Sequence, residues 1–204
     1  AYVGLIGLRG YTPQIAGTEK PMDMAFLASS ARATEMPPPD PWMAGESINY
    51  YCLGFLLHGT LARMSAVPAW VGFNLALATT FAMTAAAAAG LGYDLVRARF
   101  GRNLSLAAGA LAAFLVAVAG NLRAPIEFLR DAAQVWDAFW WQSIGWQSSR
   151  VVVDTGARIE DTINEFPSFS FILGDLHPHV MALPYTLVAL TLAMAMMRGV
   201  GDGG

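Results

Sequence analysis

The sequence has 204 residues, of which 55% are hydrophobic and 13% are charged, and its formal net charge is −3 at pH 7. Soluble domains carry about 25% charged residues, and a chain of this length has too small an interior to bury so much apolar surface. The composition argues against a soluble enzyme, a disordered segment and a nucleic-acid-binding protein, and it predicts an all-α, polytopic membrane protein. The single cysteine, Cys52, excludes an intramolecular disulfide framework and a cysteine-rich zinc module.

The first segment, residues 1–8, is apolar throughout but too short to cross a bilayer. It has neither the charged start nor the small-residue cleavage site of a signal peptide. We interpret it as the end of a span, and the chain as a piece of a longer membrane protein in which residues 1–204 form a single transmembrane module.

Three apolar runs rich in alanine and glycine predict transmembrane helices over residues 69–92, 104–122 and 181–198. Residues 47–66 begin with an uncharged stretch that holds several polar side chains, including His58. This segment is either a further span or an amphipathic helix at the membrane interface.

Loop charge predicts the sidedness of the module. Residues 93–103 carry three arginines and one aspartate, and short basic loops between spans lie in the cytoplasm. The long loops over residues 9–68 and 123–180 are more acidic than basic, so we expect both on the external face of a prokaryotic cell membrane. This assignment works if residues 47–66 are interfacial, which is the interpretation we prefer.

Within the second long loop, residues 128–146 combine aromatic and aliphatic side chains. The pattern predicts a helix that lies on the membrane, or a plain aromatic anchor, because tryptophan favours the headgroup region. Its tryptophans are Trp136, Trp140, Trp141 and Trp146.

Two carboxylates, Glu19 and Asp23, lie four residues apart soon after the first apolar segment. On a helix they would share one face, although Pro21 between them can instead start the helix. Carboxylates at a membrane surface can act as a general base and as a metal ligand. The alternative is a pair of acids that stabilises a helix N-terminus in a solvated loop.

Four prolines surround Asp40 and fix an extended backbone that holds its side chain in a defined direction. Trp42 can stack on a sugar ring or lie among lipid headgroups. Such a loop suits a substrate-facing role or a plain connector. Tyr50 and Tyr51 follow as interface anchors or substrate contacts, and His58 lies on the same helix face as Tyr51. The alternative for His58 is a hydrogen-bonded packing residue.

The most specific motif runs from Glu165 to His179. In it Asp175, His177 and His179 alternate directly before the last predicted span. Their oxygen and nitrogen donors can bind a divalent metal, or a diphosphate through that metal. Polar residues at the edge of a span are costly unless they are paired or used. The alternative is a helix cap with imidazoles that reach the interface.

Five strings together resemble the chloroflexi–archaeal "YYY-domain" membrane proteins. They are Gly-Thr-Glu-Lys-Pro-Met-Asp-Met-Ala-Phe-Leu, Pro-Pro-x-Asp-Pro-Trp-x-Ala-Gly, Ile-Asn-Tyr-Tyr, Gly-Phe-Leu-Leu-His-Gly-Thr and Gly-Asp-Leu-His-Pro-His. The resemblance covers about residues 17–190. One position departs from the pattern, because Cys52 stands where the family has its third tyrosine.

That family is similar in layout to the GT-C superfamily of integral-membrane glycosyltransferases. The resemblance implies a GT-C-like helical module with interfacial helices in two external loops. It also implies transfer of a sugar from a polyprenyl-phosphate or polyprenyl-diphosphate donor on the external face. By resemblance, Asp23 or Glu19 is the catalytic base that activates the acceptor, and Asp40 is the competing candidate.

The same resemblance implies that Asp175, His177 and His179 bind a divalent metal, Mg²⁺ or Mn²⁺, or the donor phosphate. The substrate-binding candidates are Trp42, Tyr50, Tyr51, His58 and Glu165. The arginines that could pair with phosphate are Arg123, Arg130, Arg150 and Arg158. The expected partners are the polyprenyl-phosphate sugar donor, membrane lipid and an acceptor of unknown identity, without nucleic acid.

Two other functions are compatible with the sequence. One is a non-catalytic membrane subunit or transporter, in which the acids and histidines serve ion pairing or proton movement. The other is a redox subunit in which His58 and His177 hold a haem or a metal.

Overall fold

The computed structural model describes residues 1–130, 146–152 and 162–201. Over these ranges the regular structure is helical apart from two isolated β-bridges, Pro39 with Ser47 and Val152 with Thr162, so the predicted all-α class is confirmed. The predicted interfacial helix over residues 128–146 lies mostly outside the described ranges, and so do Trp136, Trp140, Trp141 and Arg158.

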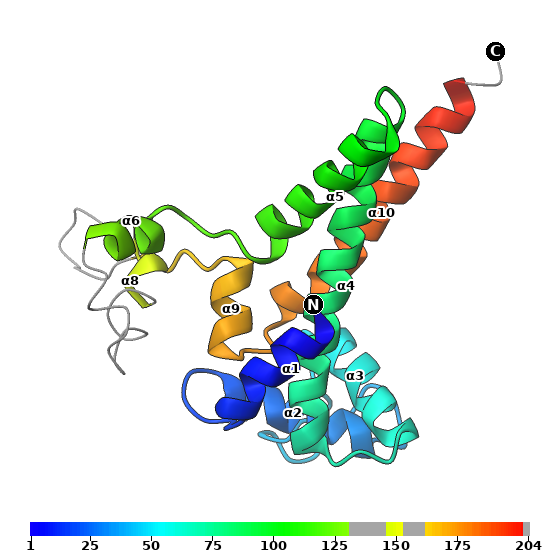
Figure 1. Cartoon of the computed structure of the whole chain (residues 1–204). Helices are drawn as coiled ribbons and strands as arrows, with labels where there is room; N and C mark the ends of the chain where they lie inside the picture. The colour runs from blue at the N-terminus through cyan, green and yellow to red at the C-terminus, as the bar shows by residue number, and fades with distance from the viewer. Residues whose placement is uncertain (131–145, 153–161, 202–204) are drawn as a thin grey trace.

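The helices follow one another from the N-terminus to the C-terminus as Figure 1 labels them. They are α1 (Tyr2–Tyr11), α2 (Lys20–Arg32), α3 (Cys52–Met64), α4 (Ala69–Arg97), α5 (Arg102–Ala117), α6 (Arg123–Arg130), α8 (Trp146–Ser148), α9 (Pro167–Leu173) and α10 (Pro178–Gly201). Proline marks several beginnings: Pro21 lies in the first turn of α2, Pro68 precedes α4 and Pro167 opens α9. Its fixed φ suits the first helical turn, where its missing N–H leaves no hydrogen bond unmade.

Among the described residues, two helices are long and apolar enough to cross a membrane. They are α4, with 29 residues, and the 21-residue stretch Pro178–Arg198 of α10. A helix of about 20 residues spans the hydrocarbon core of about 30 Å, and both exceed that length. Helix α5 is apolar but has only 16 residues and ends at Ala117, before the end of the predicted span over 104–122. That α5 crosses the membrane stays a prediction.

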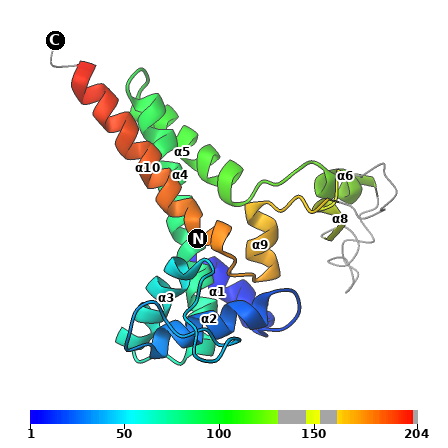
Figure 2. The ribbon, with the colours of Figure 1, turned by 180° about the vertical axis from the view of Figure 1, so that it is seen from behind.

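Helices α4 and α5 approach closely because small residues line their contact. A Cβ added at Gly109 would lie 2.7 Å from the backbone oxygen of Ala89, so only glycine fits there. At the end of α10, Arg198 Nη2 donates a hydrogen bond to the backbone oxygen of Asp94 at 2.7 Å. Figures 1 and 2 show the α4–α5 turn and the end of α10 far from α1, α2 and α3. The arginine-rich turn and the N-terminal helices therefore lie at opposite ends.

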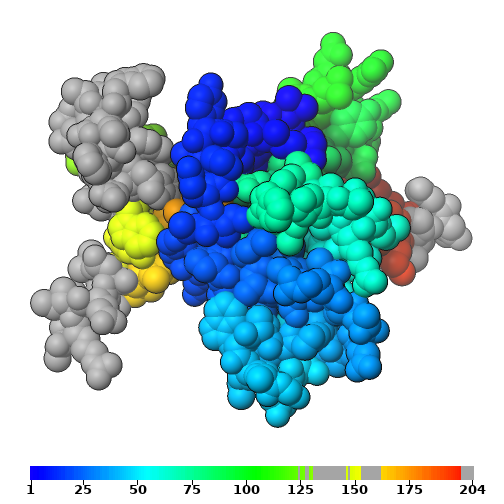
Figure 3. All heavy atoms as spheres, turned by 90° about the horizontal axis from the view of Figure 1, so that it is seen from below, coloured from blue at the N-terminus to red at the C-terminus, as the bar shows by residue number. Residues whose placement is uncertain are grey.

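Helices α1, α2 and α3 pack around the beginning of α4 and cover that end of the molecule (Figure 3). Their shared core holds the buried side chains Phe26, Leu27, Phe55, Phe73, Leu77, Phe171 and Leu176. Helix α3 crosses α2 at Gly59, where an added Cβ would lie 2.9 Å from the backbone nitrogen of Ala31. Its 13 residues extend about 20 Å, which is shorter than a bilayer core. This length favours an interfacial position for residues 47–66, which stays a prediction.

Candidate functional site

The first turn of α2 and the connection between α9 and α10 form the candidate site. The backbone oxygen of Glu19 accepts the amide hydrogens of Met22 and Asp23, which starts α2. Gly174 ends α9 in the left-handed conformation, with a φ of 78°, where glycine is favoured. This reversal directs His177 back toward α2, so residues 158 positions apart come into contact.

Four titratable side chains form a continuous chain across the site. His177 Nε2 lies 3.0 Å from Glu19 Oε2, and His177 Nδ1 lies 2.7 Å from His179 Nδ1. His179 Nε2 lies 3.4 Å from Glu165 Oε2 and 3.4 Å from Ser170 Oγ. The Glu19 carboxylate is 53% exposed, so one end of the chain is open to solvent.

The contacts allow two proton arrangements when both imidazoles are neutral, because each ring then carries one N–H. In the first, His177 donates from Nε2 to Glu19 and accepts from His179 at Nδ1, and the unprotonated Nε2 of His179 lies at ion-pair distance from a protonated Glu165. In the second, every donor and acceptor is reversed, with Glu19 protonated and Glu165 ionised. Burial raises the pKa of Glu165, which favours its protonated form. The hydrogen-bonded part of the chain can therefore carry a proton between Glu19 and His179, and Glu165 lies next to its inner end.

Asp23 lies behind this chain and is fully buried, with 0% of its surface exposed. Neither of its carboxylate oxygens, nor Oδ1 of Asp175, meets a hydrogen-bond donor among the described residues when both acids are ionised. Burial, a hydrogen bond with the carboxyl of Asp175 and the negative charges of Asp175 and Glu19 raise the pKa of Asp23 to about 9. Asp23 therefore keeps its proton at neutral pH and can donate it in a hydrogen bond to Asp175.

Two buried cations, Arg9 and Lys20, were missed by the sequence interpretation. Lys20 Nζ donates to the backbone oxygen of Leu173 at 3.0 Å, and burial and the charge of Arg9 lower the pKa of Lys20 while Asp175 opposes that shift. The Arg9 guanidinium packs against Gly174, where no Cβ could fit. Each cation had a sequence signal: Arg9 ends an apolar run and Lys20 lies between the two singled-out acids.

The structure brings the aromatic candidates toward α2. The ring of Phe26 lies 5.7 Å from that of Tyr50 and 6.1 Å from that of Trp42, and Tyr50 contacts Tyr51 at 4.6 Å between centroids. Partial burial, followed by the charges of Glu19, Tyr51 and Asp23, raises the pKa of Tyr50. Tyr50 is therefore within electrostatic reach of the acids.

Two candidates have partners elsewhere. Asp40 Oδ1 accepts the backbone N–H groups of Trp42 and Met43 at 2.7 and 3.1 Å, which holds its own turn together. His58 Nε2 lies 3.2 Å from Thr80 Oγ1, as expected of a packing histidine. No contact among the described residues joins either side chain to the acids.

The predicted metal ligands do not converge on a common point. Within the described ranges, no three His, Cys, Asp or Glu side chains converge as a metal site would require. The Nδ1 atoms of His177 and His179 face each other at hydrogen-bond distance, so neither directs that lone pair toward a common ion. As placed, Asp175, His177 and His179 do not fit a metal, and metal binding stays a prediction.

The arginines proposed for phosphate binding lie near the second long loop. Arg150 lies over the ring of Trp146, with 3.7 Å from its guanidinium carbon to the ring centroid, and donates to Ser149 Oγ. Arg123 and Arg130 bound α6, which extends away from the candidate site in Figures 1 and 2. The charge of Arg150 still reaches Glu165 and opposes the rise in the pKa of that acid, while Lys20 and Arg9 lie near Asp175 and Gly174.

No curated protein and no solved structure matches the chain. One family model, described as "Uncharacterized membrane protein (DUF2298)", matches residues 1–202. This match confirms the membrane class that composition predicted, while the finer resemblance to the YYY-domain proteins stays a prediction. Because the match covers nearly the whole chain, the protein belongs to the DUF2298 family of uncharacterized membrane proteins.

Proposed function

We propose that the protein is a GT-C-like integral-membrane glycosyltransferase that takes a sugar from a polyprenyl-phosphate-linked donor on the external face of the membrane. One observation carries the proposal: two predicted external loops contribute acids and histidines to a single cluster, with Glu19 and His177 in contact at 3.0 Å. Helix α2 and the connection between α9 and α10, which carry the cluster, lie far from the arginine-rich turn between α4 and α5 (Figure 1).

Glu19 is the better general base of the two acids in α2. Its carboxylate is exposed and hydrogen-bonded to His177, whereas Asp23 is protonated at neutral pH because its pKa is raised to about 9. In the transfer step, the acceptor oxygen attacks the anomeric carbon of the sugar and Glu19 takes the proton of the acceptor. The bond between the anomeric carbon and the phosphate oxygen breaks, and polyprenyl phosphate leaves with the electron pair.

Other residues support this step through charge and orientation. His177 holds the Glu19 carboxylate and can pass its proton along the chain to His179. Lys20 places positive charge beside the acids, which favours an approaching anionic phosphate. Trp42, Tyr50 and the neighbouring Tyr51 offer aromatic surfaces on which a sugar ring can stack. Since Asp175, His177 and His179 as placed do not fit a divalent metal, every step of this mechanism uses the chain's own residues.

The test is a transfer assay on the full-length protein with a radiolabelled polyprenyl-phosphate sugar. Removal of a general base costs about 10²–10⁴ in rate, so we expect a loss in that range for Glu19→Gln. The matched control is Asp40→Asn, which keeps the oxygen acceptor of its turn and should retain transfer. Full transfer by the combined Glu19→Gln, Asp23→Asn and Asp40→Asn variant would refute the proposal.

A second candidate function is proton movement by a transporter. It is favoured by the hydrogen-bonded chain from Glu19 through His177 to His179, which ends 3.4 Å from Glu165. This function predicts substrate-dependent proton flux in liposomes containing the full-length protein. The flux should disappear in His179→Ala, and liposomes without any flux would exclude it.

A further inference from the structure

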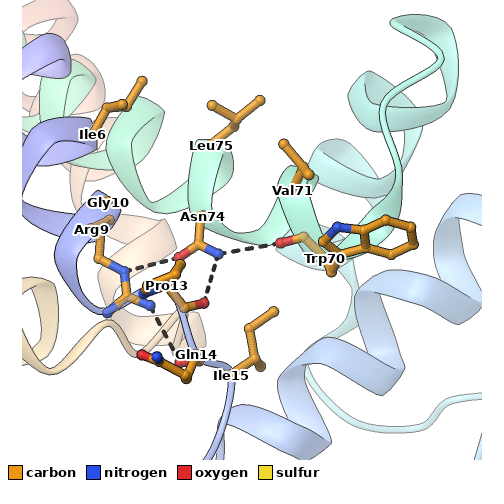
Figure 4. Close-up of a pocket in the computed structure, with 10 residues that line it drawn as sticks. All are labelled: Ile6, Arg9, Gly10, Pro13, Gln14, Ile15, Trp70, Val71, Asn74 and Leu75. Carbon is orange, nitrogen blue, oxygen red and sulfur yellow. Dashed lines mark hydrogen bonds between the residues drawn. The ribbon is translucent and has the colours of Figure 1, made fainter.

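A cleft of about 550 Å³ lies between α1 and the beginning of α4, and Arg9 is among the residues that line it. Figure 4 shows Ile6 and Arg9 on one wall, Leu75 and Val71 on the other, and the segment between α1 and α2 closing the bottom. Its volume is in the range of pockets that bind small ligands.

The walls of this cleft are apolar, and Arg9 is the charged residue that lines it. Arg9 is only 4% exposed. Its Nε donates to Asn74 Oδ1 at 2.9 Å and its Nη2 to the backbone oxygen of Gln14 at 3.5 Å. A guanidinium has five N–H donors, so these bonds leave donors for another acceptor. Within the part of the chain that the structure describes, no carboxylate forms an ion pair with Arg9.

The cleft lies beside the beginning of α4, at the depth where lipid headgroups surround the end of a membrane-spanning helix. Trp70, Val71 and Leu75 belong to the first two turns of this candidate span. The ends of a span meet the headgroup region, where tryptophan is enriched, and the side chain of Trp70 is 63% exposed. Cationic pockets between membrane helices are matched in charge and depth by anionic lipid headgroups.

We infer that this cleft binds an anionic phospholipid of the surrounding bilayer, with its phosphate at Arg9 and the first part of an acyl chain along Ile6, Val71 and Leu75. The lipid phosphate accepts hydrogen bonds from the guanidinium donors that Asn74 and Gln14 leave free. It fills apolar volume that α1 and α4 leave between them. None of the residues that line the cleft takes part in the proposed transfer reaction.

Native mass spectrometry of the purified full-length protein tests the inference, with phosphatidylglycerol and phosphatidylcholine titrated in turn. Wild type should retain phosphatidylglycerol in preference to phosphatidylcholine. A basic side chain contributes about fivefold to the binding of an anionic lipid, so Arg9→Gln should lower the preference by about that factor. Val71→Trp fills the cleft from a partly exposed position and should reduce retention of both lipids.

The matched control is Ala182→Trp, which fills a second apolar groove of about 450 Å³ between α3 and α10. It should leave lipid retention at the wild-type level. If Arg9→Gln fails to fold, the comparison of lipid retention between Val71→Trp and Ala182→Trp still tests the inference. An unchanged preference in Arg9→Gln, or equal retention in the two tryptophan variants, would overturn the inference. Retention of farnesyl phosphate in place of phosphatidylglycerol would also overturn it, since the occupant would then be the prenyl donor.

Discussion

Replacing Asp23 with asparagine should stabilise the protein at neutral and alkaline pH. In the folded protein the pKa of Asp23 is about 9, against an ordinary carboxyl value of 3.8. Because the pKa of Asp23 is higher in the folded than in the unfolded protein, its protonated carboxyl favours the folded state. This contribution to stability is complete below about pH 4 and is lost as the pH rises toward 9. An asparagine carries no charge at any of these pH values and can donate a hydrogen bond to Asp175.

The magnitude follows from the distance between the two pKa values. At pH 7 Asp23 is ionised in the unfolded chain but protonated in the folded protein. Burying this acid therefore lowers the free energy of unfolding by at most about 4 kcal/mol, which corresponds to the distance between pH 7 and the ordinary carboxyl pKa. The variant still buries the carboxyl of Asp175, so only part of this destabilisation is removed. We therefore expect Asp23→Asn to raise the free energy of unfolding by at least about 1 kcal/mol at pH 7. For a chain of this size, that corresponds to about 2–4 °C in Tm for each kcal/mol.

The assay is thermal unfolding of the purified protein in detergent at pH 5, 7 and 9. The difference between Asp23→Asn and wild type should grow as the pH rises. Asp40→Asn serves as the control, because it retains the acceptor for the backbone of its turn, and it should change stability by less than about 0.5 kcal/mol. Parallel curves for wild type and Asp23→Asn across the three pH values would refute the burial argument, as would a less stable variant at pH 9.

Three further predictions test the packing and the proton chain. Gly174→Ala should cost about 1–3 kcal/mol in thermal unfolding, since its backbone is left-handed and an added Cβ would collide with the buried guanidinium of α1; a variant as stable as wild type would contradict this. Gly59→Ala should also lower Tm, because backbone atoms of α2 lie 2.9 and 3.0 Å from the new Cβ, whereas Gly10→Ala has open space and should not. His177→Gln keeps a donor for Glu19 but cannot pass on a proton, so the transfer assay should show a rate reduced by about 10²-fold or more, and an unchanged rate would remove the histidines from the mechanism.

The sequence predicted several elements of the fold because their signals are local. An uncharged apolar run has few alternatives to a helix in a bilayer, so α4 and the long apolar helix α10 could be predicted from residues 69–92 and 181–198 alone. The end of α5 could not be predicted from the sequence, because the apolar run continues beyond Ala117, where the helix ends.

The candidate site was predicted in its parts but not in its arrangement. Residue type and motif singled out Glu19, Asp23, Asp175 and the two histidines near α10, whereas nothing in the spacing distinguished them from Asp40. Only tertiary contacts show that Asp40 stabilises its own turn while Glu19 meets His177 across 158 positions.

Composition and local sequence pattern by themselves showed that this is a helical membrane protein. They also showed which residue types are available for chemistry. The tertiary structure decided the raised pKa of Asp23, the burial of Lys20 against the end of α9 and the burial of Arg9 at an apolar cleft. The physical reason is that a side chain's charge state depends on how much water and which charges surround it. Those neighbours come from α1, α2, α4 and the α9–α10 connection, segments that the chain brings together only when it folds.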